Sequence, residues 1–91
     1  MVTTIKLYGA LAKKKDMNTI YALVIEEFEK MLSRNNCQII NVSSSDSTKT
    51  LLGRNQVVTV IWSGTSSQIK SSYDVSVHYG LFGIPDSVRL Y

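Results

Sequence analysis

The feature that most constrains this chain is one amphipathic stretch between residues 16 and 34. Its apolar residues recur every three or four positions and therefore share one face of a helix, whereas polar residues fill the opposite face. The apolar face comprises Met17, Ile20, Tyr21, Val24, Phe28, Met31 and Leu32. We expect a helix over 16–34 that packs on a sheet, with Asp16 as its N-cap and Asn35 and Asn36 as its stop.

Several other segments have the residue types and the patterns of strands. They cover residues 3–8, 37–43, 57–62, 73–79 and 87–91. The segment 57–62 is apolar on both faces, which is typical of a central strand. Alternation along this strand places Val57 and Ile61 on the face of the sheet that points away from the helix.

The helix and the first four strands follow one another in the order β-α-β-β-β, with 87–91 as a short terminal strand, and 91 residues are enough for one domain. We therefore predict an α+β fold in which residues 1–91 form a single domain. One helix packs on one face of a four- or five-stranded mixed, mostly antiparallel sheet. The stretches 43–56 and 63–72 lack a clear period and should be long connections. The second face of the sheet is left partly bare, so we expect the functional surface there.

The cysteine content and the hydropathy of the chain indicate a compartment. The only cysteine, Cys37, excludes an internal disulfide and fits a reducing environment. No apolar run approaches the 18 residues of a membrane-spanning helix, and the first residues lack the basic and apolar regions of a signal peptide. We therefore expect a cytoplasmic protein, in the host cytoplasm if it is viral, without a membrane partner.

Residue types that support catalysis or metal binding are scarce. His78 is the only histidine, and it lies far in sequence from Cys37 without a metal-ligand spacing. His78 is explained as a strand histidine that faces solvent, and Cys37 as a thiol that packs like a small apolar side chain. We therefore predict no catalytic residue, no metal site, no cofactor and no enzymatic activity.

A lysine run offers a weak anion-binding signal. Lys13, Lys14 and Lys15 follow Gly9 near a helix start, where free backbone amides favour an anion. The second glycine and the following Ser or Thr of a phosphate-binding loop are missing. A small anionic ligand at this loop is therefore only the third functional hypothesis.

Basic charge is concentrated outside the predicted helix. The formal net charge is +3, but the segment 16–34 holds four acidic and two basic residues, so the remainder of the chain carries +5. If the first strand and the strand 73–79 are neighbours, Lys6 and Tyr8 join His78 in a basic and aromatic surface. Arg54 adds a basic residue on the connection before the central strand. Such surfaces bind single-stranded nucleic acid, which is the second hypothesis.

Three blocks of the first half carry a family resemblance. They are Ile-Lys-Leu-Tyr-Gly at 5–9, the segment 20–32 with its Ile-Glu-Glu-Phe-Glu-Lys-Met-Leu, and Gln-Ile-Ile-Asn-Val at 38–42. Together they resemble the β-α-β core of small sporulation-associated and prophage proteins of Bacillus-type bacteria, over less than half of the chain. The resemblance implies an accessory protein that a phage could encode, and it brings no catalytic residues. The basic, Ser-rich second half departs from it.

The leading hypothesis is a small non-enzymatic binding protein that acts through protein–protein contact, such as a phage-encoded inhibitor of a host system. Only 19% of the residues are charged, below the usual quarter of a soluble domain, which fits a surface partly covered by another chain. Val57 and Ile61 cannot be covered by the single helix, so we expect a partner protein or a second copy on the sheet face or edge.

Overall fold

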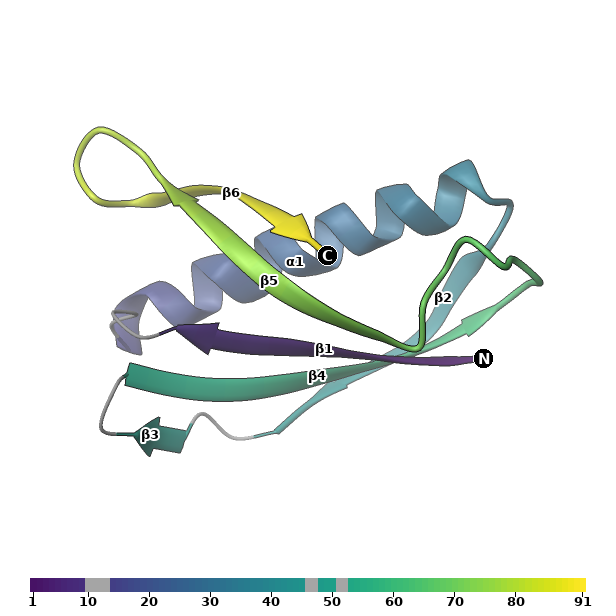
Figure 1. Ribbon diagram of the computed structural model, residues 1–91, viewed down its shortest axis with the longest axis horizontal. Coiled ribbons are helices and arrows are strands. Elements are labelled where there is room, and N and C mark those ends of the chain that lie inside the picture. The colour runs from purple at the N-terminus through teal and green to yellow at the C-terminus, as the bar shows by residue number, and fades with distance from the viewer. Residues whose placement is uncertain (10–13, 46–47, 51–52) are drawn as a thin grey trace.

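The elements of the fold follow the predicted order, with one strand more. The computed structural model describes residues 1–9, 14–45, 48–50 and 53–91. These residues form one helix and six strands: β1 (Val2–Gly9), α1 (Lys14–Arg34), β2 (Gln38–Ser44), β3 (Thr48–Thr50), β4 (Gly53–Ser63), β5 (Ser72–Tyr79) and β6 (Pro85–Leu90). The helix packs on the sheet, which confirms the predicted α+β class (Figure 1).

The sheet is mixed, and its strand order is β2-β4-β1-β5-β6, with β3 paired to the beginning of β4. β4 runs antiparallel to β1, β2 and β3, whereas β1 and β5 are parallel. Because β1 and β2 are both antiparallel to β4, they run parallel to each other, with α1 as the connection and β4 between them. The apolar segment 57–62 therefore lies in the central strand, as its pattern predicts.

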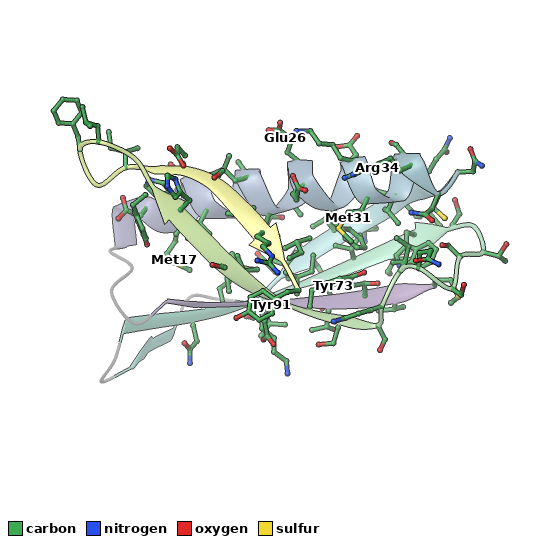
Figure 2. The ribbon with its side chains drawn as sticks, turned by 45° about the horizontal axis from the view of Figure 1, so that its top comes forward. Met17, Glu26, Met31, Arg34, Tyr73 and Tyr91 are labelled. Carbon is green, nitrogen blue, oxygen red and sulfur yellow. The ribbon has the colours of Figure 1, made fainter. Side chains whose placement is uncertain are left out.

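The core lies between α1 and the sheet. Five residues of the predicted apolar helix face are buried, and two, Tyr21 and Met31, are only partly buried against the core. Figure 2 shows Met17 and Met31 between helix and sheet with Glu26 on the outer side. Phe28 is fully buried and meets Tyr73 of β5 edge-to-face, with 6.0 Å between the ring centroids. The sheet contributes alternate residues of its strands: Ile5, Leu7, Val58, Val60, Trp62 and Tyr73.

A short hydrogen-bonded chain is buried in this core. Trp62 is 1% exposed, and its indole N–H donates to the hydroxyl of Thr3 at 2.9 Å. The Thr3 hydroxyl in turn donates to the carbonyl of Lys70 at 2.8 Å. The indole N–H therefore finds a partner without reaching solvent, and the 63–72 connection is held against β1.

The helix begins at Lys14, two residues before the predicted start, so Asp16 lies in its first turn and is not its N-cap. An acidic residue in the first turn still interacts favourably with the free amides there. The helix ends as predicted: Asn36 has a φ of 57°, and the amide of Cys37 donates to the carbonyl of Leu32 at 2.8 Å.

The expectation of a long connection over 43–56 is wrong. Thr48–Thr50 pairs with Gly53–Asn55, so this stretch holds β3 and the first residues of β4. Ser45 extends the β2 pairing. Its amide donates a hydrogen bond to the carbonyl of Val57, and its hydroxyl accepts one from the Val57 amide. These polar segments become strands because their backbones pair with a neighbour, which an apolar period does not reveal.

β5 leaves the main sheet partway along its length. It pairs with β1 only over Ser72–Asp74, and from Val75 onward it pairs with β6. The β5–β6 hairpin bends toward α1, and β6 contacts the helix (Figure 1). Its connecting loop extends at one end of the molecule, beyond the first turn of α1 (Figures 1 and 2).

Candidate functional site

The open face of the sheet carries an exposed apolar pair. Val2 of β1 and Ile61 of β4 are register partners, and they are 54% and 39% exposed. Asn41 of β2 continues this row on the other side of Ile61. Val57 also lies on this face but is partly buried, and its register partner is Lys6. The structure thus places Val57 and Ile61 on the face that the alternation predicts.

The middle of the open face is a row of hydroxyl side chains. Ser43, Thr59, Thr4 and Ser72 follow one another across β2, β4, β1 and β5 in direct register. Because these side chains are short and uncharged, they leave the neighbouring Val2 and Ile61 accessible to another molecule.

β2 and β6, the two ends of the strand order, differ in how they are protected against pairing. β2 contains no charged residue and no proline, and Ile40 at its bulge is 64% exposed. β6 contains Pro85, Asp86 and Arg89, which are residues that discourage the addition of a further strand. Of these two strands, β2 therefore has the less protected edge, and it lies next to the exposed pair of the open face.

The predicted basic and aromatic sheet surface does not assemble as expected. β1 and β5 are neighbours, but the register partner of Lys6 is Asp74, and β5 turns away before it reaches His78. Tyr8 is paired with Asn55 at the other side of β1. At this place the sheet therefore carries a basic residue, Lys6, beside an acidic one, Asp74. A surface that binds nucleic acid is expected to carry basic and aromatic side chains instead.

The remaining basic candidates converge on one end of the molecule. Lys14 and Lys15 occupy the first turn of α1, and Arg54 in β4 is the register partner of both Gly9 and Lys49. Lys13 lies outside the described residues. These segments are far apart in sequence, and Figures 1 and 2 show them at the same end of the molecule, where β1 finishes and β4 begins, with α1 in the layer next to the sheet.

His78 forms a defined polar contact. Its Nδ1 lies 2.6 Å from a carboxylate oxygen of Asp86, across the β5–β6 hairpin, and both side chains are exposed. The hydrogen bond with His78, reinforced by the attraction of the imidazole, lowers the pKa of Asp86. The histidine therefore links the two strands of the hairpin close to its loop.

This contact predicts a shift that can be measured. In a His78→Gln variant, the pKa of Asp86 followed by carboxyl NMR should rise toward its ordinary value. Because the pKa of Asp86 is lower in the folded than in the unfolded protein, the pair stabilises the fold only where the carboxyl is ionised. This stability is present above the unfolded-state pKa and is lost as the pH falls through the folded-state pKa. An Asp86 titration that is identical in both proteins would contradict the contact.

Cys37 is packed as a small apolar side chain. It is 3% exposed, and its thiol contacts the carbonyl of Asn35 at 3.3 Å. Among the described residues, no group of three or more His, Cys, Asp or Glu side chains is arranged to hold a metal ion.

The sequence does not predict the exposure of the apolar side chains on one loop, although two of them, Leu81 and Phe82, are the most exposed large hydrophobic residues described. Leu81, Phe82 and Ile84 lie on the loop of the β5–β6 hairpin and are 94%, 85% and 61% exposed. The sequence shows only a glycine-interrupted apolar turn there, because an apolar run without a period does not reveal which side faces solvent.

Comparison with protein-family models, curated proteins and solved structures finds no match to this chain. No helix within the described part of the chain is long and apolar enough to cross a membrane.

Proposed function

We propose that this protein is a small non-enzymatic binding protein whose contact surface is the open sheet face together with the β2 edge. One observation carries the proposal: α1 covers one face of the sheet only, so the adjacent Val2 and Ile61 remain exposed on the other. Moving a fully exposed side chain of this kind out of water contributes about 1.5–3 kcal/mol, and because Val2 and Ile61 are 54% and 39% exposed, their burial in a partner contributes roughly half of that each.

The β2 edge supplies the directional part of the contact. An edge strand without charges or proline can accept a strand from another chain, whose backbone groups then pair with those of β2. Specificity would come from the neighbouring Ile40, Asn41 and Ile61. A second copy of the chain is the simplest occupant, since antiparallel pairing of two β2 strands satisfies both edges at once. A phage-encoded inhibitor that occupies the surface of a host protein would use the same edge.

Light scattering across a concentration series tests this surface. The wild-type chain should exceed its monomer mass of 10.2 kDa as concentration rises, and Ile61→Lys should remain monomeric because a buried ammonium has no partner there. Thr19→Lys adds the same charge on the exposed side of α1 and should associate like the wild type. A strict monomer that also captures no host protein would rule out the proposal.

A further inference from the structure

The loop of the β5–β6 hairpin presents an apolar tip to solvent, separate from the surface proposed above. Leu81 and Phe82 have the largest exposed fractions among the large hydrophobic side chains described, with Ile84 exposed beside them. Tyr79, at the base of the tip, is 40% exposed. Contiguous exposed apolar side chains of this kind mark a contact with another molecule.

The tip is held in place by its own hydrogen bonds. The amide of Gly80 donates to the carbonyl of Ile84 at 2.8 Å, and the amide of Gly83 donates to the carbonyl of Gly80 at 3.0 Å. Pro85 is buried directly after the loop, and the contact of Asp86 with His78 joins the two strands just behind it. The side chains are therefore exposed on an ordered turn.

The tip shares its end of the molecule with basic residues. Figures 1 and 2 both place the hairpin loop, the first turn of α1 and the β3–β4 pairing at the same end of the long axis, with the loop extending farthest. These elements carry Lys14, Lys15, Lys49 and Arg54. The acidic residues described on the same elements at this end are Asp16 and Asp86, so basic residues outnumber them by four to two.

We propose that this end of the molecule binds peripherally to an anionic lipid surface. The hairpin tip would lie in the apolar boundary, and the first turn of α1 and the β3–β4 pairing, which carry the basic residues, would face the lipid phosphates. A peripheral contact combines these two signals, because a few inserted side chains hold weakly by themselves and basic residues near an anionic surface add to the attraction. With the tip inserted, the ring of Tyr79 at its base would meet the headgroups, where amphipathic rings are enriched. Such a contact requires no membrane-spanning segment, but it would make the expectation of no membrane partner wrong.

The residue types at the tip favour lipid over the other partners. Phe82 and Tyr79 offer rings on which bases could stack, but Leu81 and Ile84 beside them are aliphatic and are buried only by an apolar phase, which lipid supplies and nucleic acid does not. A second copy of the tip would bring two basic ends together. The basic residues come from three elements spread over the whole end, which fits a broad anionic surface better than a pocket that receives only the tip.

Vesicle co-sedimentation tests the proposal. The wild-type chain should bind phosphatidylcholine vesicles that contain phosphatidylserine, and bind vesicles of phosphatidylcholine alone much more weakly. The double variant Leu81→Ser/Phe82→Ser should lose at least about tenfold in partitioning, because two inserted apolar side chains are removed. Lys14→Ala/Lys15→Ala should lose about tenfold at low salt and less at high salt, where the charges are screened.

Matched controls separate the tip from general surface effects. Tyr91→Ser removes a 55% exposed aromatic ring away from the tip, and Lys30→Ala/Lys70→Ala removes the same charge as the lysine pair from other elements. Both should bind anionic vesicles within about twofold of the wild type.

A fluorescence measurement tests the tip directly. In Phe82→Trp, vesicles should shift the emission of the new indole to shorter wavelength, while the emission of the buried Trp62 stays constant. Circular dichroism verifies that each variant is folded.

Three results would overturn the proposal. The folded wild-type chain could fail to bind anionic vesicles at low salt, or the tip variants could bind as well as the wild type. Alternatively, a single-stranded oligothymidylate could bind as strongly as the vesicles with the same dependence on Lys14 and Lys15, which would assign this end to nucleic acid.

Discussion

Replacing Phe28 by Ala should lower the free energy of unfolding by about 3–5 kcal/mol, as expected when a buried aromatic ring is removed and a cavity remains. The ring is fully buried in α1 and contacts Tyr73, so its removal affects both the helix and the strand that links the hairpin to the sheet. A domain of this size has a total stability of about 5–10 kcal/mol, so the variant should unfold at a much lower denaturant concentration.

The neighbouring Glu29 provides the control. It lies on the exposed side of the same helix, and Glu29→Ala should change the free energy of unfolding by less than about 0.5 kcal/mol. Urea unfolding of both variants gives the comparison. Equal losses would show that the burial of the helix face is wrong, and with it the identification of the opposite sheet face as open.

Introducing a side chain at Gly64 should destabilise the fold by about 2–5 kcal/mol. Gly64 has a φ of 125°, which residues with a side chain rarely adopt, and a Cβ there would lie 2.6 Å from the Sγ of the buried Cys37. Backbone strain contributes about 1–3 kcal/mol, and overpacking against the thiol adds about as much again. Thermal and urea unfolding of Gly64→Ala measure the sum.

Two further variants separate the strain from the clash. Gly83 also has a positive φ, 70°, but a Cβ there would meet nothing within 4 Å, so Gly83→Ala should show a backbone cost without a clash, smaller than the one at Gly64 because 70° lies nearer the allowed left-handed region. In a double-mutant cycle, Cys37→Ala should recover part of the loss caused by Gly64→Ala, because the Sγ atom is removed. Additive effects in this cycle would mean that the two residues do not contact each other.

The sequence predicts the parts of this fold that depend on local periodicity. The spacing from Met17 to Leu32 identifies the buried face of α1, and the alternation around Val58 assigns Ile61 to the opposite face. In both cases one residue's environment follows from its neighbours along a single element. The start of the helix was placed less well, because the lysines before Asp16 are good helix formers and carry no clear boundary.

The parts that were missed depend on contacts between distant segments. Thr48–Thr50 is a strand only because Gly53–Asn55 lies beside it, and its polar sequence gives no period. The separation of Lys6 from His78 arises because β5 changes partner after Asp74, a choice that no local pattern encodes. The exposure of Phe82 likewise depends on how the hairpin leaves the sheet.

The position of β4 between β1 and β2 has a consequence for the order in which the chain folds. β1 and β2 are separated by a helix in sequence, yet neither pairs with the other, and both obtain their hydrogen bonds from a strand that begins at Gly53. The first half of the chain therefore cannot close a sheet by itself, either during synthesis or as a fragment. The sheet forms only when β4 inserts between β1 and β2, so we expect β4 to be structured in the folding transition state. The folding rate should therefore be low, as in domains of high contact order, despite the long helix.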